Sequence, residues 1–244
     1  MLKNVILLTI LFCASQFMLA QDTQQEHKDE FNDEEVIAKS IDRHPNSKHF
    51  SHLYVGYGFV LGEQSKKGSD IIYGKSHSFD LGWLYKYKIS ERFNIGVDVY
   101  YNYQVFHLKQ DSSKTLPNNF LHHKEKLIVN QMNGDAFLRI RLKRSPMLMG
   151  KFIDLGAYGG YVVNAKMIVV DKLQTVNAYG SKETETIHNK LNFIEPLQYG
   201  AFARFGLGHF VFTFRYRLTD LFKKSYNFTE MPVYNVGIRF GFHD

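Results

Sequence analysis

The clearest structural signal in the sequence is the stretch RFNIGVDVYYNYQVFH at residues 92–107. Apolar side chains occupy every second position, and the positions between them are mainly small or polar, with Asp98 and Asn102 among them. The apolar set consists of Phe93, Ile95, Val97, Val99, Tyr101, Tyr103 and Val105. Successive side chains of a β-strand point to opposite faces, so this period of two predicts a strand with one apolar and one polar face.

Seven further segments repeat the alternation, two of them less regularly: 53–61, 79–87, 136–142, 152–165, 191–205, 209–219 and 234–242. The connections between the eight predicted strands alternate in length. Short ones lie near 89–91, 144–150 and 207–208, and longer ones near 63–73, 109–126, 166–190 and 220–231. An even number of strands with short turns at one end and long loops at the other is typical of outer-membrane barrels, and it places both termini on the short-turn side.

The direction of the apolar face follows from its size. The eight segments carry 37 large side chains on their apolar faces, whereas about twelve side chains fill the well-described eight-stranded α/β barrel. The apolar face must therefore point outward into lipid. A two-sheet sandwich would bury more side chains, but the regular alternation of connections favours a barrel. We predict an all-β fold, an eight-stranded antiparallel up-and-down transmembrane β-barrel with short periplasmic turns and long external loops.

The chain before the strands has a different composition. Residues 1–20 combine Lys3, a short apolar stretch and Ala20, which is the layout of a secretory signal peptide. Residues 21–49 carry eight acidic and four basic side chains. We expect this acidic segment to lie in the periplasm, either as a solvated tether or as a short helix that binds a partner. The predicted boundaries are thus 1–20 for the signal peptide, 21–49 for the acidic segment and 50–242 for the barrel.

Charged side chains fall on the polar face of the predicted strands and are expected to point into the lumen. Buried charges must be paired, and the guanidinium group of arginine matches a carboxylate well. We therefore predict a structural lumen network that plugs a narrow barrel, rather than an anion-lined pore. Its expected members are Asp80, Lys86, Asp98, Asp135, Arg139, Arg141, Asp154, Arg204, Arg215, Arg217 and Arg239.

Motifs for catalysis or cofactor binding are weak. The single cysteine, Cys13, excludes a zinc site built from several thiolates, and adjacent His122 and His123 do not face one metal ion. We predict no metal, no cofactor and no catalytic residues. Nucleic acid is not an expected partner, because no run of four or more Lys and Arg accompanies the net charge of +6.

The closing stretch Val236–Phe242, VGIRFGF, together with the signal peptide and eight alternating strands, resembles the small outer-membrane β-barrels of Bacteroidota, including PorT-like barrels. It is similar in architecture to the OmpX and OmpA transmembrane domains. The resemblance implies location in the outer membrane, contact with outer-membrane lipid and lipopolysaccharide, and insertion by the barrel-insertion machinery. It also implies a non-enzymatic structural or accessory role in membrane integrity, secretion or assembly.

Two other functions stay open at this point. The first is a surface adhesion or ligand-binding barrel that acts through the long loops 109–126 and 166–190. The second is a lipid-A-modifying enzyme, for which the only hint is Ser76-His77-Ser78 near the end of a strand. A periplasmic or secretion-machine protein is a further expected partner, bound through residues 22–45.

Overall fold

The computed structural model describes residues 45–62, 68–142, 150–176 and 179–242. The predicted signal peptide and nearly all of the predicted acidic segment lie outside these ranges. The strands are β1 (His49–Leu61), β2 (His77–Lys88), β3 (Phe93–Leu108), β4 (Lys124–Arg141), β5 (Lys151–Lys172), β6 (Glu183–Asn189), β7 (Leu197–Leu207), β8 (Phe210–Arg217) and β9 (Tyr234–Phe242). A 3-10 turn, η1 (Lys224–Tyr226), lies between β8 and β9.

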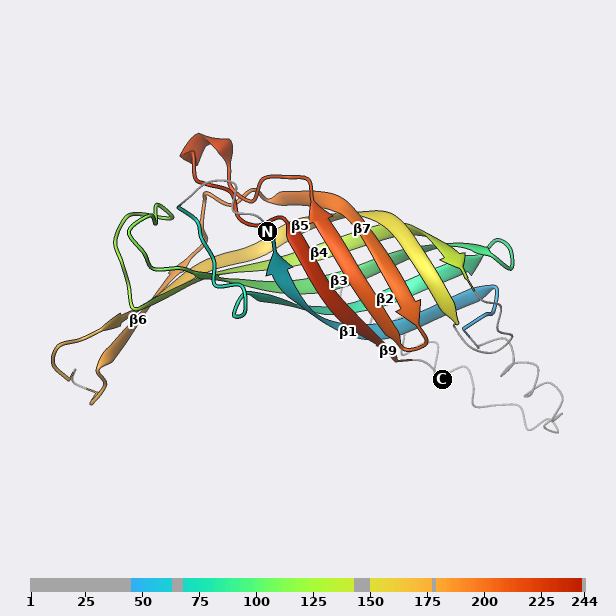
Figure 1. Ribbon diagram of the computed structural model, residues 1–244, viewed down its shortest axis with the longest axis horizontal. Coiled ribbons are helices and arrows are strands. Elements are labelled where there is room, and N and C mark those ends of the chain that lie inside the picture. Colours follow the sequence, from blue (N-terminus) through green and yellow to red (C-terminus); the bar gives the residue numbers. More distant parts are fainter. Residues whose placement is uncertain (1–44, 63–67, 143–149, 177–178, 243–244) are drawn as a thin grey trace, which may run out of the picture. The chain divides into compact units, whose positions relative to one another are not determined.

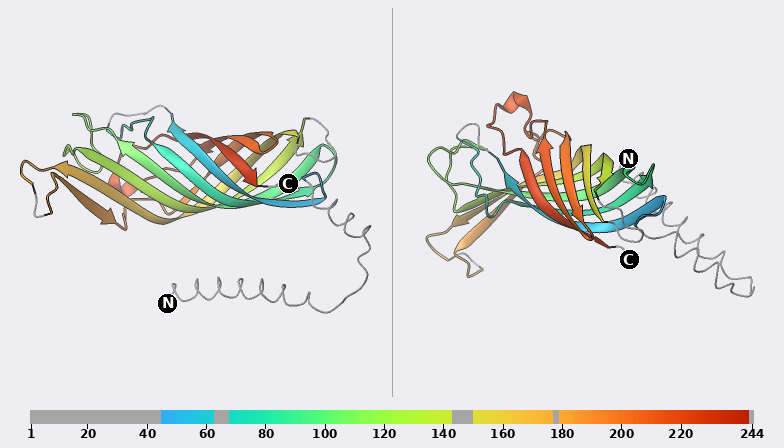
Figure 2. Two further views of the ribbon diagram at one scale, coloured as in Figure 1. Left: turned by 90° about the horizontal axis from the view of Figure 1, so that it is seen from below. Right: turned by 45° about the vertical axis from the view of Figure 1, so that its right-hand side comes forward.

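Eight of these strands close into a ring, as Figures 1 and 2 show. The order around the sheet is β4-β3-β2-β1-β9-β8-β7-β5, and pairing of β4 with β5 completes the circle. Every pairing is antiparallel. The predicted eight-stranded up-and-down barrel is confirmed. We call the end with the connections at 89–92, 142–150 and 208–209 the short-turn end, and the opposite end the long-loop end.

The two faces of the wall differ in the way that the sequence predicts. Outward side chains are apolar and exposed, for example Leu53 at 57%, Val99 at 51% and Leu155 at 50%. Inward side chains are often charged, yet Asp98 and Asp154 are 1% and 0% exposed. A closed sheet satisfies its own backbone hydrogen bonds, and an apolar outer surface of this extent requires lipid around it. The wall is therefore a membrane-spanning barrel.

No helix in the described ranges is long and apolar enough to cross a membrane.

Two strands are longer than predicted. β4 begins at Lys124 rather than 136, and β5 continues to Lys172 rather than ending at 165. The outer part of β5 pairs with β6, which lies inside the stretch predicted as the loop 166–190. Figure 1 shows this β5–β6 hairpin extending beyond the barrel. The predicted strand 191–205 begins only at Leu197.

A register shift explains why apolar and polar residues alternate less regularly in β5 than in the other strands. Asn130 of β4 pairs with Asn164 and Gln131 pairs with Val162, so Val163 is an extra residue in β5. Such a bulge moves the following side chains to the opposite face. Tyr158 is accordingly an inward side chain below the bulge, and the odd-numbered Met167 packs inward above it.

The long-loop end has an apolar core of its own, which we call the cap core. It joins the inward side chains of the extended strands to residues from the long connections. Loop residues therefore fold against the barrel mouth instead of lying on it as isolated polar segments. Its buried members are Val60, Ile71, Phe106, Leu108, Leu116, Leu127, Val129, Ala165, Met167, Val169, Ile194, Leu221, Phe222 and Met231.

Candidate functional site

Three carboxylates and three guanidinium groups meet in the middle of the barrel. Arg239 Nη1 lies 2.7 Å from Asp98 Oδ2, and Arg204 Nη2 lies 2.9 Å from the same oxygen. One carboxylate thus accepts hydrogen bonds from two arginines, which connects the group into a single network. Each member comes from a different strand of β2, β3, β4, β7, β8 and β9. We call the six residues the central network: Asp80, Asp98, Asp135, Arg204, Arg215 and Arg239.

The remaining contacts of the central network involve its other two carboxylates. Arg215 Nη2 lies 2.7 Å from Asp80 Oδ2, and the Asn102 amide donates to Asp80 Oδ1 at 2.7 Å. Arg204 also pairs with Asp135. Each of the three carboxylates therefore contacts at least one arginine, which meets the requirement that buried charges be paired.

A separate ion pair lies nearer the short-turn end. Arg139 Nε and Nη2 bind the two oxygens of Asp154 at 2.7 and 2.8 Å, across the paired strands β4 and β5. The Arg139 guanidinium also stacks on the ring of Phe152, 3.6 Å from its centroid. The two-bond geometry and the aromatic face together hold this arginine in one orientation.

Aromatic rings fill much of the lumen that the charged residues leave. Arg204 lies 4.1 Å from the Phe202 ring, Arg239 lies 4.3 Å from the Tyr54 ring, and Arg215 lies 4.7 Å from the Tyr100 ring. The Tyr54 hydroxyl donates to Asp98 Oδ1 at 2.7 Å. The prediction did not include these rings among the lumen residues. Inward aromatic residues carry no polar signal, so their place becomes visible only when the strand faces are assigned.

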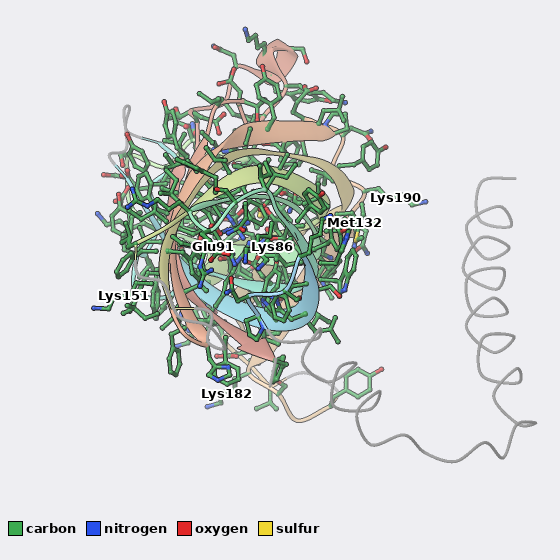
Figure 3. The ribbon with its side chains drawn as sticks, turned by 90° about the vertical axis from the view of Figure 1, so that its right-hand side faces the viewer. Lys86, Glu91, Met132, Lys151, Lys182 and Lys190 are labelled. Carbon is green, nitrogen blue, oxygen red and sulfur yellow. The ribbon has the colours of Figure 1, made fainter. Side chains whose placement is uncertain are left out.

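Three of the eleven predicted lumen residues lie apart from these pairs. The Lys86 ammonium donates to the Pro45 carbonyl oxygen at 2.6 Å, and Arg141 bonds Asn46, both at the short-turn end. Arg217 lies toward the long-loop end and donates to Glu230 Oε1 at 2.7 Å. In Figure 3, which looks along the barrel, Lys86 lies within the ring of strands, whereas Met132 and Lys151 lie at its outside.

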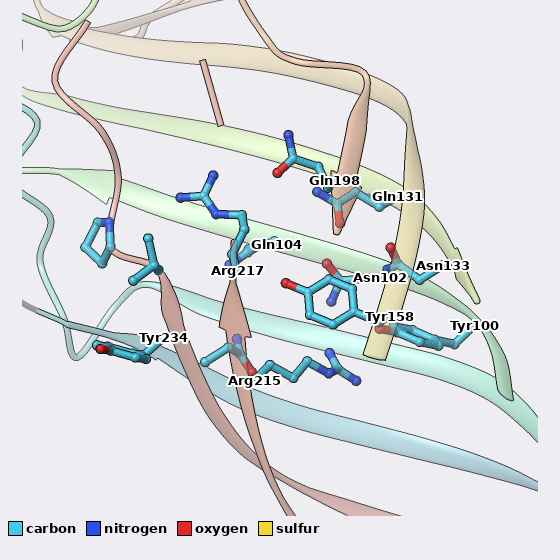
Figure 4. A pocket seen from close by; sticks show the side chains of 13 residues that line it. Tyr100, Asn102, Gln104, Gln131, Asn133, Tyr158, Gln198, Arg215, Arg217 and Tyr234 are labelled. Atoms are coloured by element: carbon cyan, nitrogen blue, oxygen red, sulfur yellow. The ribbon is translucent and has the colours of Figure 1, made fainter. Parts of the chain in front are cut away.

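The eight residues of the paired groups carry four negative and four positive charges, so their formal charges cancel. Little space remains beside them. One polar cavity of about 40 Å³ lies next to Arg215, and Figure 4 shows amide side chains such as Asn102 and Gln131 turned toward it. A second cavity near Arg139 measures about 20 Å³. Spaces of this size hold on the order of a few water molecules.

A larger cavity of about 420 Å³ lies at the long-loop end. We call it the cap cavity. Its walls come from the connection between β3 and β4, the outer part of β5, strand β6 and the segment after β6. Most of the lining falls in the loops 109–126 and 166–190 that the sequence singled out for ligand binding, although Glu125 belongs to β4 and Leu191 and Phe193 follow the second loop. The lining residues are Pro117, Asn118, Phe120, His122, Glu125, Met167, Val169, Asp171, Thr186, His188, Leu191 and Phe193.

Glu125 is the buried charge of the cap cavity, with 2% of its surface exposed. Its Oε2 accepts from the Lys114 ammonium at 2.6 Å and from the Gln110 amide at 3.1 Å. Its Oε1 is buried and has no hydrogen-bond partner among the described residues. Elsewhere on the wall, His122 Nδ1 lies 2.8 Å from Asp171 Oδ1. The cavity thus combines mainly apolar walls with a buried carboxylate whose charge is paired with Lys114.

The connection that carries Glu125's partners is fixed by a local turn. The Ser113 hydroxyl donates to Asp111 Oδ1 at 2.6 Å and the Ser113 backbone N–H donates to the same oxygen at 3.0 Å. These bonds, helped by Lys109, hold the pKa of Asp111 down at about 2. The carboxylate therefore stays ionised, and the turn that leads to Lys114 keeps its form, at any physiological pH.

The residues of the weaker sequence motifs, Ser76, His77 and Ser78, make separate contacts. The Ser76 hydroxyl donates to the Ile72 carbonyl, Ser78 Oγ accepts from Asn235, and His77 Nδ1 lies 2.7 Å from the Lys75 carbonyl oxygen. None of these contacts joins a serine hydroxyl to the histidine. No cluster of three or more His, Cys, Asp or Glu residues suited to a metal ion occurs in the part of the chain that the structure describes.

The fold defines the class of protein, a membrane-spanning β-barrel of eight strands. No protein-family model and no curated protein matches the chain. Among solved structures, it is similar to Ail, the attachment invasion locus protein of Yersinia pestis. The structure of Ail alone is 15% identical, with a TM-score of 0.32 and coverage of 80% of this chain and 99% of Ail. The complex of Ail with the heparin analogue sucrose octasulfate is 14% identical, with a TM-score of 0.30 and coverage of 79% and 97%.

Proposed function

We propose that the protein is a non-enzymatic, non-conducting barrel of the outer membrane that acts by binding at its long-loop end. The cap cavity is the observation that carries this proposal. Paired charges and aromatic rings lie in the lumen, and the long connections build a folded cap with a cavity of about 420 Å³. Ligand sites are usually concave, mostly apolar and furnished with a few polar groups, with volumes of about 300–1,000 Å³.

Three observations support the individual parts of the proposal. The apolar outer wall and the expected signal peptide favour the outer membrane. The balanced ion pairs favour a plugged lumen. The hydroxyl groups of Ser76 and Ser78 and the ring of His77 each bond to a different group elsewhere. This favours a non-enzymatic role over lipid-A modification, which needs an activated nucleophile. Kinship with the PorT-like barrels of Bacteroidota remains a prediction from the sequence.

Site-specific labelling tests both the location and the orientation. The only natural cysteine is Cys13, within the expected signal peptide, so a single introduced cysteine reports unambiguously. Glu185→Cys on exposed β6 should react with a membrane-impermeant maleimide on intact cells. Arg92→Cys, exposed in the short turn between β2 and β3, is the matched control and should react only after lysis. Labelling of Arg92→Cys alone on intact cells would reverse the orientation and contradict the proposal.

A second candidate function is favoured by one observation. Pro45 and Ser47 are buried at the short-turn end, where Lys86 holds the Pro45 carbonyl oxygen. Pro45 is therefore held at the short-turn end, which suits docking of a periplasmic or secretion-machine protein on residues 22–45. Affinity capture from native membranes, with residues 22–43 present or deleted, tests this accessory role. A partner that depends on the segment supports it, and identical captured proteins with both chains contradict it.

A further inference from the structure

Basic side chains gather on the outward face of the wall, close to the long-loop end. His107, Lys126 and Lys166 each lie next to inward side chains of the cap core along their own strands. Because successive side chains of a strand alternate between faces, these three point outward. His77 shares their face, since it pairs with Val105, two residues before His107. We call the whole set the basic patch: Lys75, His77, His107, Lys126 and Lys166.

The members of the basic patch are close neighbours. His107 pairs directly with Lys126 across β3 and β4, and the ring centroids of His77 and His107 are 6.5 Å apart. Lys166 is the diagonal neighbour of Lys126 across β4 and β5. Burial of His107, followed by the positive charges of Lys126, His77 and Lys75, lowers the pKa of its imidazole. These basic groups therefore lie close enough to repel one another when they are charged.

The three lysines of the basic patch have no acidic counterpart. Among the residues that the structure describes, Lys75, Lys126 and Lys166 take part in no ion pair. Lys75 is exposed and the other two are half-buried. Two carboxylates of the same strands, Glu125 and Asp171, line the cap cavity on the opposite face of the wall. A cluster of like charges without counter-charges attracts an anion.

An apolar floor lies on the same outward face as the lysines. Val105, Ile128 and Ile168 form one cluster and are only 2%, 2% and 5% exposed, so neighbouring side chains cover them. Lys166 pairs with Ile128, and Lys126 pairs with Ile168. The lysine stems border this floor and can lie on it, while their ammonium groups reach the solvent. Packing of the stems reduces the ordering that an anion would have to impose.

The position of the basic patch identifies the anion. Tyr57, Phe79 and Tyr103 form an outward row across three paired strands, and Phe79 lies two residues from His77 toward the short-turn end. Tyr57 also stacks on His77, with ring centroids 5.6 Å apart. Rows of aromatic residues mark the two interfaces of a membrane barrel. The apolar wall continues below the row, for example at exposed Leu81.

We propose that the basic patch binds the phosphate groups of a lipid in the outer leaflet. Phosphates beside the ammonium groups and acyl chains against the apolar wall below them belong to one molecule of this kind. Lysine is a common binder of phosphate, as a point charge, and basic clusters at a membrane surface bind anionic lipid. The inference goes beyond the proposed binding at the cap cavity, and it rests on the proposed location in the outer membrane.

The test uses the chain without residues 1–20, folded in uncharged maltoside micelles, with native mass spectrometry to measure bound lipid. The probes are lipid A with both of its phosphates and the same lipid after removal of both. We expect the phosphorylated lipid to bind roughly tenfold more tightly, because basic residues attract an anionic headgroup. Equal binding of the two lipids would overturn the proposal. Inorganic phosphate should not displace the lipid, and displacement would assign the patch to a free anion instead.

A combined variant, Lys75→Gln, Lys126→Gln and Lys166→Gln, removes three charges from the patch. It should weaken binding of the phosphorylated lipid roughly tenfold, and the three corresponding arginine substitutions should retain it because they keep the charge. The matched control changes three exposed lysines outside the patch to glutamine and should bind as the unaltered chain does. These control positions are Lys172, Lys182 and Lys224. Equal weakening in the patch and control variants would mean that net charge alone attracts the lipid, and would overturn the site.

The gel shift between folded and unfolded forms verifies that each variant is folded before lipid is added. Loss of the phosphate preference, with cysteine labelling as expected, would reject the basic patch as a lipid site and leave the proposed location and orientation standing. Reversed cysteine labelling would contradict the proposed orientation, which the micelle assay does not measure.

Discussion

Arg239 on β9 and Asp98 on β3 bond across the lumen at 2.7 Å, although β1 and β2 separate their strands in the sheet. The pair therefore links two distant parts of the barrel wall through its interior. Arg204 joins the same carboxylate from β7, so Asp98 connects three strands that do not pair with one another. The central network thus ties the barrel together from inside, in addition to the hydrogen bonds of the sheet.

Loss of Asp98 should destabilise the barrel strongly. Asp98→Ala removes the acceptor for Arg239, Arg204 and the Tyr54 hydroxyl, and leaves buried guanidinium charges without that partner. Removal of one partner from a buried ion pair costs about 3–5 kcal/mol. Urea unfolding in lipid vesicles, followed by the gel shift between folded and unfolded forms, measures the difference. Glu185→Ala on exposed β6 is the control and should change little; equal stability of both variants would contradict the role of Asp98.

The filled lumen predicts an electrically silent protein. The charges of the paired groups cancel, and the cavities beside them measure only about 40 and 20 Å³. Planar bilayers that contain the heat-modifiable, folded protein should show little steady conductance. Large and stable anion-selective channels would contradict the plugged lumen.

Lipid around the barrel can be tested by two substitutions at equally exposed sites. Val99 on β3 is 51% exposed and Ile187 on β6 is 49% exposed, but only Val99 lies on the barrel wall. Val99→Lys should lower the free energy of unfolding by about 2–4 kcal/mol, because a lysine near the bilayer midplane is costly. Ile187→Lys, in the hairpin beyond the wall, should have little effect. Equal effects in vesicle unfolding experiments would mean that the apolar face does not meet lipid.

Two glycines of the wall predict opposite outcomes on substitution. A Cβ at Gly96, on the inward face, would meet the Phe137 ring and lie 2.6 Å from the Tyr85 carbonyl oxygen. At Gly134 the nearest atom, the Asp98 carbonyl oxygen, is 3.9 Å away. Gly96→Ala should therefore destabilise the barrel by roughly 1–3 kcal/mol through overpacking, and Gly134→Ala should be neutral or slightly stabilising. The midpoint of urea unfolding compares them, and equal midpoints would contradict the tight fit at Gly96.

The sequence was sufficient for the barrel and insufficient for the cap, for a physical reason. Within the membrane the wall separates lipid from a polar lumen, so residues such as Val97 and Asp98 alternate clearly. Beyond the membrane the outward face meets water and the inward face packs on the cap core, so the alternation no longer identifies a membrane strand. Lys126 and Leu127 show this reversal, because the charged residue now faces outward and the apolar one is buried.

The lumen shows the same division between local and long-range information. The alternation identified Asp98 and Arg239 as inward side chains, but which arginine pairs with which carboxylate depends on the shear of the closed barrel. The cap cavity is lined by three separate stretches of the chain, 117–125, 167–171 and 186–193, and the buried charge of Glu125 is paired with Lys114. No local pattern carries that information.

Truncation of the acidic segment should separate its role from the role of Pro45. Lys86 has only 2% of its surface exposed, and its ammonium group donates to the Pro45 carbonyl oxygen at 2.6 Å. Deletion of residues 22–43 retains this acceptor, so we expect the chain to reach its heat-modifiable form with an unchanged unfolding midpoint.

Deletion of residues 22–47 removes the acceptor and also Asn46, a partner of Arg141. That longer deletion removes both bonds from Lys86 and Arg141 and should lower the midpoint in urea, because hydrogen bonds to charged groups contribute more than neutral ones. If the shorter deletion already prevents folding, the acidic segment belongs to the fold and is not a separate segment.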